Sequence, residues 1–331
     1  MKHVQMSPTS LGETGPLVSP LALGCMGLSG MYGPSRDDVG IATIQAALDA
    51  GITLLDTGDF YGMGQNEMLI AKAIEGRRQS VQLSVKFGAL RAPDGSFVGV
   101  DNRPAAVKNF AAYSLKRLGA DVIDIYRPAR LDPNVPIEDT IGAVADLVKQ
   151  GYVRHIGLSE VGVQTVQRAN AVHPICDVQI EYSLVSRRPE ESLFPALQAM
   201  GISATLYGVL SRGLLSGRAP TGPGDFRAHL PRFSGDNGAQ NQRLVQSVRQ
   251  FAADRGQTAA ALCLAWALAK QPNFVPLIGP RTPQQLEELL AALAKPLTTG
   301  EVQELETLVP AAAIAGSRYA EAHMAHLDSE R

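Results

Sequence analysis

Short apolar runs alternate with longer amphipathic stretches along most of this chain. The short runs have the length of buried strands, and they predict strands at residues 21–24, 52–56, 81–86, 122–127, 153–158, 177–180, 202–207 and 273–278. Between them, apolar residues recur at the spacing of one helix face, as in VGIATIQAALDA and EDTIGAVADLVKQG. Eight strand-then-helix units predict an α/β fold of the (β/α)8 TIM barrel type. A doubly wound open sheet is the alternative.

Three segments lie outside these units. Residues 1–20, broken by glycine and proline, predict a small N-terminal hairpin that plugs the bottom of the barrel. Residues 218–237 predict a long loop after the seventh strand, of a kind that often serves as a lid or binding loop. Residues 294–331 predict a C-terminal helix or tail, and the stretch after Pro310 is expected near the pocket mouth. Without an internal repeat or linker, residues 1–331 are expected to form one domain, with the barrel core at about residues 17–293.

The composition and charge of the chain argue against a nucleic-acid-binding protein and against a membrane-spanning one. The 331 residues are 45% hydrophobic and 19% charged, with a formal net charge of -2, which is typical of a soluble globular protein. This balance provides no basic surface for nucleic acid, and the longest apolar run, residues 259–269, is too short to span a bilayer. Three widely separated cysteines and an N-terminus without an apolar segment favour the cytoplasm. His323 and His326 have no further ligands nearby, so we expect no metal, and oligomeric state has no signal in the sequence.

Candidate catalytic residues lie at the predicted strand ends, where TIM barrels place their active sites. Among them, Asp56, Tyr61 and Lys86 make a coherent acid–base set. A buried lysine tends to lose its proton, but Asp56 nearby would keep Lys86 charged. That charge would lower the pKa of Tyr61 and make its hydroxyl a better proton donor. The alternative is a structural ion pair between Asp56 and Lys86. The remaining strand-end residues are Cys25, Met26, Ala129, Arg130, Ser159, Glu160, Gln179, Tyr207, Gly279 and Arg281.

A candidate anion site follows the eighth strand. Thr282 is a good helix N-cap, Pro283 suits the first helical position, and Gln285 completes a capping-box pattern. A helix N-terminus preceded by Arg281 is suited to bind a phosphate. The alternative is an ordinary capped helix beside a solvated arginine. Neither G-x-G-x-x-G nor G-x-x-x-x-G-K-[ST] occurs, which argues against a Rossmann or P-loop nucleotide site.

Several motifs point to one family when they are taken in order along the chain. They are ITLLDTGDFYGMGQNE, VKFG, GYVRHIGLSE, DVQIEYSL, YGVLSRGLL and IGPRTPQQLEELL. Together, from about Leu17 to Leu293, they resemble the aldo-keto reductase family, with Asp56, Tyr61 and Lys86 at the positions of its catalytic residues. The resemblance implies NADPH-dependent reduction of a ketone or aldehyde to an alcohol, or the reverse, with Tyr61 as general acid. A small carbonyl compound is then the expected partner.

The resemblance also implies how NADPH is bound. Ser159 and Gln179 would hold the nicotinamide carboxamide, and Tyr207 would stack on the ring, with core packing as its alternative. Arg281 would bind the 2′-phosphate and so favour NADPH over NADH. Glu160 and Leu289 depart from the family pattern, which usually has Asn at both positions. The full implied set is Met26, Ser159, Gln179, Tyr207, Gly208, Val209, Leu210, Arg212, Gly279, Arg281, Gln285 and Glu288.

One catalytic residue of the family is missing. Its histidine just past the fourth strand corresponds to Ala129, which cannot donate a hydrogen bond to a carbonyl oxygen. Losing one such donor typically slows a reaction about 10²- to 10³-fold. Three explanations are open: a pocket enlarged for a bulky ketone, substitution of the histidine by Arg127, or an NADPH-binding redox sensor or regulatory subunit with weak catalysis. A Schiff-base aldolase that uses Lys86 as nucleophile is a further alternative.

Overall fold

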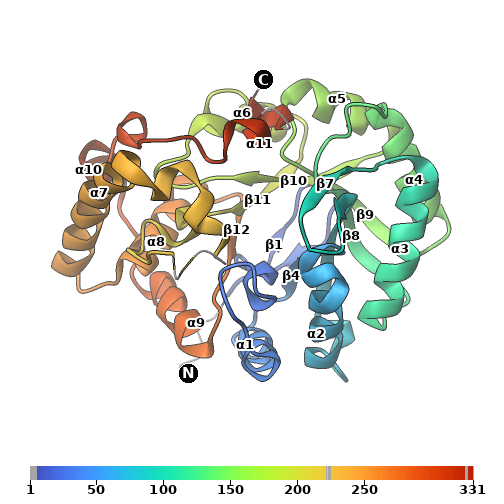
Figure 1. Ribbon diagram of the computed structural model, residues 1–331, viewed down its shortest axis with the longest axis horizontal. Coiled ribbons are helices and arrows are strands. Elements are labelled where there is room, and N and C mark those ends of the chain that lie inside the picture. The colour runs from blue at the N-terminus through green and yellow to red at the C-terminus, as the bar shows by residue number, and fades with distance from the viewer. Residues whose placement is uncertain (1–5, 221, 223–224, 325–326, 331) are drawn as a thin grey trace.

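The computed structural model of the protein describes residues 6–220, 222, 225–324 and 327–330, without the side chains of residues 322 and 323. Eight parallel strands form a closed barrel in the order β10-β11-β12-β3-β4-β5-β8-β9, surrounded by helices (Figure 1). The predicted TIM barrel is confirmed, and the open sheet is wrong because β12 pairs with β3 and closes the ring. The barrel strands are β3 (Ala22–Gly24), β4 (Leu54–Gly58), β5 (Gln82–Phe87), β8 (Ile123–Pro128), β9 (Val153–Ser159), β10 (Ile175–Glu181), β11 (Ser203–Tyr207) and β12 (Val275–Ile278).

The helices cover the outer face of the barrel, so most strand residues are buried on both sides. Every residue of β4 and β8 is buried, so neither strand alternates between a buried and a solvent-exposed face. The α-helices are α1 (Asp37–Asp49), α2 (Gln65–Ala73), α3 (Pro104–Leu118), α4 (Ile137–Lys149), α5 (Val163–Val172), α6 (Leu193–Ala199), α7 (Gly235–Asp254), α8 (Ala259–Lys270), α9 (Pro283–Leu290), α10 (Thr299–Leu308) and α11 (Glu321–Met324). None of these described helices has both the length and the apolar character needed to cross a membrane.

The N-terminal hairpin forms as predicted. β1 (Thr9–Ser10) pairs antiparallel with β2 (Leu17–Val18). Leu11 and Val18 are buried in one apolar cluster with residues of the barrel interior, including Ile125 and Val275. This packing closes the end of the barrel opposite the strand C-termini.

Two regions differ from the sequence prediction. A second hairpin, β6 (Ala89–Arg91) with β7 (Phe97–Val100), follows β5 and was not predicted, because its residues are partly exposed and form no apolar run. The loop after the seventh strand ends sooner than residue 237, because α7 begins at Gly235. The first turns of α7 are held from outside the helix: Asn241 Nδ2 donates to the carbonyls of Arg232 and Ala315, both at 2.9 Å.

The C-terminal segment returns to the mouth of the barrel after α10 (red in Figure 1). Asp328 Oδ2 accepts a hydrogen bond from the Gly162 N–H at 2.8 Å, at the start of α5. Glu330 pairs with Arg188 at 2.7 Å, just before α6. These contacts place Asp328 and Glu330 over the loops that follow β9 and β10, near the pocket where a tail was expected.

Candidate active site

Asp56, Tyr61 and Lys86 lie together at the C-terminal end of the barrel. β4 and β5 are paired with Gly58 beside Lys86, so residues at both strand ends face the same space. Lys86 Nζ donates a hydrogen bond to Asp56 Oδ2 and lies 5.3 Å from the centre of the Tyr61 ring. All three residues are buried. The structure therefore brings together the three residues that the sequence singled out for acid–base chemistry.

Asp56 also accepts hydrogen bonds from two other strands. Its Oδ1 accepts from Ser84 Oγ at 3.1 Å and from Gln179 Nε2 at 2.8 Å. We call Asp56, Tyr61, Ser84, Lys86 and Gln179 the Asp56–Lys86 cluster. Each member belongs to a barrel strand or to the turn that directly follows one.

Burial determines the proton affinities in this cluster. Burial lowers the pKa of Lys86, although the charge and hydrogen bond of Asp56 oppose this. Burial also raises the pKa of Tyr61 well above 10, the charge of Asp56 adds to the rise, and the charge of Arg130 opposes it. The net direction is thus opposite to the expected lowering by Lys86, because desolvation of the phenolate outweighs nearby positive charge. Tyr61 consequently keeps its proton at neutral pH.

Arg127 does not reach the space beside Ala129. Its side chain is turned into the barrel, where it donates to Asp177 Oδ2 at 2.9 Å and to Ser84 Oγ at 3.1 Å. Both the guanidinium and the Asp177 carboxylate are fully buried. Breaking such a pair leaves an uncompensated buried charge, so Arg127 is held in the interior. The hypothesis that Arg127 replaces the missing histidine disagrees with this arrangement.

Ala129 and Arg130 directly follow β8. The Ala129 N–H donates to the Phe87 carbonyl at 2.8 Å and extends the pairing of β8 with β5. Arg130 donates from one terminal nitrogen to the Ala129 carbonyl at 2.7 Å and from the other to the Tyr319 hydroxyl at 3.3 Å. Across the residues that the structure describes, no carboxylate forms a salt bridge with Arg130.

A second charged cluster lies at the ends of β9, β10 and β11, and the sequence did not predict it. Arg318 donates to both carboxylate oxygens of Glu160, at 3.1 and 2.9 Å. Arg212 donates to Glu181 Oε2 at 2.8 Å, and Arg232 lies 3.7 Å from Glu181 Oε1. We call these five residues the Glu160–Glu181 cluster. Burial alone would raise the pKa of Glu160, but the charge and hydrogen bonds of Arg318 outweigh it and hold that pKa well below its usual range.

Tyr319 connects this cluster to Arg130. Its ring lies 4.4 Å from the Arg212 guanidinium, and its hydroxyl is 3.2 Å from the Tyr207 hydroxyl. The Tyr207 hydroxyl in turn donates to Glu160 Oε1 at 2.7 Å, and Ser329 Oγ donates to Glu160 Oε2 at 2.7 Å. Both carboxylate oxygens of Glu160 therefore already accept hydrogen bonds. The family usually has Asn at this position, and the carboxylate of Glu160 is explained by its contacts with Arg318 and Ser329 of the C-terminal segment.

Several features near the mouth fit a dinucleotide. The Ser159 hydroxyl belongs to a buried residue and has no hydrogen-bond partner among the described residues. After β11, Gly208, Ser211 and Arg212 all have positive φ, of 71°, 46° and 56°, and such backbone turns present N–H groups to an anion. Val209 and Leu210 lie in the same turn. At Gly279 a Cβ would contact only the Gly24 carbonyl, at 3.8 Å, which leaves room for close approach of a ligand.

The predicted anion site at α9 forms in part. Thr282 caps the helix by accepting from the Gln285 N–H at 3.2 Å, and Pro283 is its first residue. Gln285 Oε1 accepts from the Arg281 N–H at 2.9 Å, one residue before the N-cap that a capping box would use. Arg281 itself donates to the carbonyls of Tyr32, Gly33 and Pro34, and Glu288 pairs with Arg218 at 3.2 Å. Met26 begins a short 3-10 helix (Met26–Leu28) after β3 and is half-buried.

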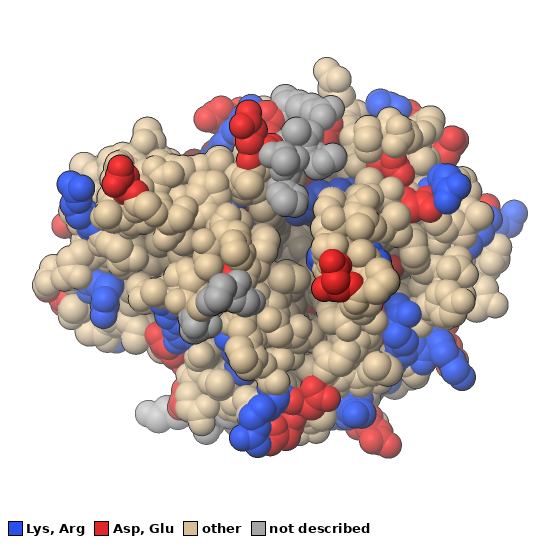
Figure 2. All heavy atoms as spheres, in the orientation of Figure 1, with Lys and Arg blue, Asp and Glu red and all other residues tan. Residues whose placement is uncertain are grey.

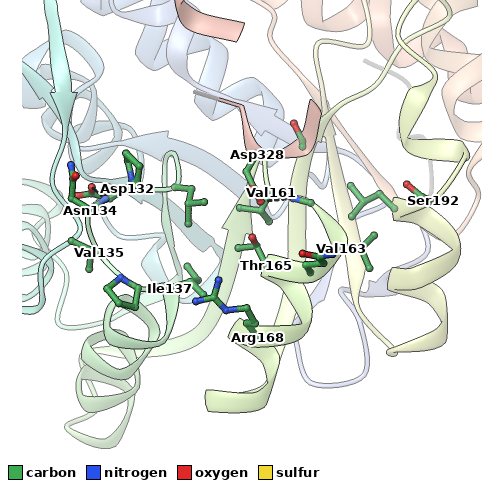
Figure 3. A pocket seen from close by; sticks show the side chains of 17 residues that line it. Asp132, Asn134, Val135, Ile137, Val161, Val163, Thr165, Arg168, Ser192 and Asp328 are labelled. Atoms are coloured by element: carbon green, nitrogen blue, oxygen red, sulfur yellow. Dashed lines mark hydrogen bonds between the residues drawn. The ribbon is translucent and has the colours of Figure 1, made fainter. Parts of the chain in front are cut away.

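The face that contains the mouth is hollowed near its centre, and the charged side chains visible there lie mainly toward the outside (Figure 2). Beside the mouth, a cavity of about 840 Å³ lies between the segment leading into α4 and the start of α5 (Figure 3). Asp132, Val161, Thr165, Arg168 and Asp328 are among the residues around it. No cluster of three or more potential metal ligands is found in the described parts of the chain, and His326 and the side chain of His323 lie outside them.

Comparisons with known proteins agree with this architecture. Residues 20–310 match the model of the aldo/keto reductase family. A probable aldo-keto reductase from Glycine max is 38% identical over 96% of this chain and 93% of its own length. The glycerol dehydrogenase of Gluconobacter oxydans superposes with a TM-score of 0.81 at 25% identity, covering 93% of this chain and 95% of that one. The holo form of an aldo-keto reductase from Bacillus halodurans gives 0.77 at 29% identity, covering 93% and 97%. This chain therefore belongs to the aldo/keto reductase family.

Proposed function

We propose that the protein reduces a ketone or aldehyde to an alcohol with NADPH, or catalyses the reverse reaction, with Tyr61 as the general acid. Family membership supports carbonyl reduction in general. The observation that supports the specific proposal is the burial of Asp56, Tyr61 and Lys86 together at the barrel mouth. The three free and buried cysteines agree with a cytoplasmic protein.

In this proposal residues at the ends of β9 to β12 would hold the cofactor. Ser159 and Gln179 would hold the nicotinamide carboxamide, and Tyr207 would stack on the ring. Gly208, Val209, Leu210 and Arg212 would hold the pyrophosphate, and Arg281, just before α9, would hold the phosphate of the adenosine half, together with Met26, Gly279, Gln285 and Glu288. When bound, reduced nicotinamide supplies a hydride to the carbonyl carbon. Arg281 is the basis for proposing NADPH rather than NADH.

Tyr61 supplies the proton in this mechanism. Because burial raises its pKa above 10, Tyr61 is protonated at neutral pH and can donate to the carbonyl oxygen. The Lys86 ammonium, 5.3 Å from the ring, favours the phenolate that remains after proton transfer. Asp56 keeps Lys86 in position, with Ser84 and Gln179 as further donors. The small buried side chain of Ala129 leaves room for a bulky carbonyl substrate.

The test is a Tyr61→Phe variant assayed by NADPH oxidation with aldehydes and ketones. We expect turnover to fall by about 10²-fold or more, because a general acid typically contributes that factor, while NADPH affinity is kept. Tyr152→Phe is the matched control, since Tyr152 lies on the surface with 48% of its area exposed. Turnover of Tyr61→Phe close to that of the unchanged protein would contradict the mechanism.

A further inference from the structure

Arg130 is a partly buried cation that forms no salt bridge with a carboxylate of the described chain. The arginines with strongly buried side chains in the described chain all form ion pairs: Arg127 with Asp177, Arg227 with Asp225, and Arg212, Arg232 and Arg318 within the Glu160–Glu181 cluster. Arg130 instead donates to one carbonyl and one hydroxyl. A charge held by one carbonyl and one hydroxyl contributes less to stability than a paired one, so the position of Arg130 at the barrel mouth points to a use outside stability.

The backbone fixes Arg130 at the barrel mouth. Ala129, directly before it, is hydrogen-bonded to the carbonyl of Phe87, the residue after Lys86. The Ala129 carbonyl and the Tyr319 hydroxyl each bind one terminal nitrogen of the guanidinium. A guanidinium has five N–H donors, so donors remain for a ligand.

The charge of Arg130 acts on the groups that carry out the proposed chemistry. It favours ionisation of Tyr61 and lowers the pKa of Lys86. Burial opposes the charged form of Arg130, whereas the charge of Glu160 favours it. The Ala129 carbonyl that binds the guanidinium directly follows β8, which pairs with the strand that carries Lys86, so Arg130 lies at the same end of the barrel as Tyr61.

We propose that Arg130 is the second hydrogen-bond donor to the carbonyl oxygen of the substrate, which Ala129 cannot be. This inference rests on the proposed function. When the carbonyl carbon accepts a hydride with its electron pair, the π electrons of the C=O bond move onto the oxygen. The oxygen then takes the proton of Tyr61, leaving a phenolate, while Arg130 donates hydrogen bonds throughout and transfers no proton. A preorganised donor of this kind stabilises the negative charge that develops in the transition state.

The experiment compares the unchanged protein with Arg130→Met and Arg130→Lys. Each is assayed with a neutral aldehyde and with an aldehyde that carries a carboxylate, and NADPH affinity is measured separately by protein fluorescence. We expect Arg130→Met to lower kcat about 10²- to 10³-fold for both aldehydes, with NADPH affinity kept. Arg130→Lys, which retains a charged donor, should recover part of the loss. In alcohol oxidation, where the Tyr61 phenolate is the base, the apparent pKa should rise in Arg130→Met.

Two controls separate catalysis from structure. Arg91→Met removes another partly buried arginine, whose side chain donates to the Gly95 carbonyl within its own hairpin, and it should change kcat by less than about threefold. The free energy of unfolding of Arg130→Met should fall by no more than about 1–3 kcal/mol, because two hydrogen bonds but no ion pair are lost. A structural role would instead lower stability and NADPH affinity together.

Different failures are distinguishable. If the unchanged protein reduces carbonyl compounds and Tyr61→Phe does not, the proposed function holds. The result for Arg130→Met then tests only the proposed role of Arg130. If Arg130→Met kept its kcat for the neutral aldehyde and raised KM only for the carboxylate-bearing one, the proposed role of Arg130 would be overturned. Arg130 would then bind the carboxylate of anionic substrates instead. Absence of turnover in the unchanged protein, despite NADPH binding, would overturn both proposals.

Discussion

The two charged clusters at the barrel mouth are built in different ways. The Asp56–Lys86 cluster consists of residues on β4, β5 and β10 and in the turn after β4. The Glu160–Glu181 cluster also begins at strand ends, but its carboxylates are neutralised by Arg212, Arg232 and Arg318, which lie outside the strands. Arg318 is 158 residues from Glu160 in the chain. One cluster is therefore part of the barrel, and the other joins the C-terminal segment to it.

The two clusters therefore have different roles at the mouth: the first is arranged around a proton donor, and the second attaches the C-terminal segment to the barrel. In the first cluster a single ammonium and a single carboxylate stand beside Tyr61, where their charges act on a proton donor. In the second cluster, the carboxylate oxygens of Glu160 already accept hydrogen bonds from Arg318 and Ser329. We infer that changes to the first cluster alter the chemical step, and changes to the second alter stability and the shape of the pocket.

Lys86→Met should have the largest combined effect, because it lowers both turnover and stability. Removing the ammonium leaves Asp56 as a buried anion, and breaking such a pair typically costs about 3–5 kcal/mol. The Ser84 and Gln179 donors should keep the loss near the lower end of that range. We also expect turnover to fall about 10²-fold, because the charge beside Tyr61 is gone. Urea unfolding and NADPH oxidation measure the two effects.

The control for this change is Lys116→Met on the exposed face of α3, which should alter stability by less than about 0.5 kcal/mol. If Lys86→Met retained full turnover, Asp56 and Lys86 would be a structural ion pair only.

Arg318→Met should affect stability much more than the chemical step. Glu160 would lose its bidentate partner, at a cost of about 3–5 kcal/mol in the free energy of unfolding. Tyr319 is the next residue, so its placement against Tyr207 should loosen and the KM for substrate should rise. We expect kcat to change by less than about tenfold. A large loss of kcat with unchanged stability would break the comparison between the two clusters.

Glu160→Gln should have the smallest effect and a pH dependence of known sign. The pKa of Glu160 is depressed in the folded protein, so its ionised form contributes stability above the unfolded value of about 4.3, and that contribution is lost as pH falls. The variant should be less stable than the unchanged protein by about 1–3 kcal/mol at pH 7. The difference should shrink as pH is lowered below about 4. Glu75→Gln, on the exposed surface, is the control, and a difference that grew in acid would contradict the assignment.

The sequence predicted Asp56, Tyr61 and Lys86 of the first cluster because their positions follow from the order of the strands, but it did not predict that Ser84 and Gln179 donate to Asp56. Asp56 and Lys86 end consecutive barrel strands, and strands that follow one another in a (β/α)8 barrel are neighbours. The second cluster was not predictable in this way, because nothing near residue 318 indicates that its side chain packs against β9. The same reasoning explains Arg127. Residues 127 and 129 are two apart in an extended strand, so the sequence predicted that their side chains share one face. In the structure the buried guanidinium of Arg127 instead pairs with Asp177 inside the barrel.

The most direct test of the central claim is deuterium transfer from NADPH that is labelled on the transferable position of its nicotinamide. The account predicts one deuterium on the former carbonyl carbon for each NADPH oxidised, with transfer slowed about 10²-fold or more in Tyr61→Phe. Tight NADPH binding with no deuterium in any carbonyl product would contradict it, and would favour a cofactor-binding regulatory protein.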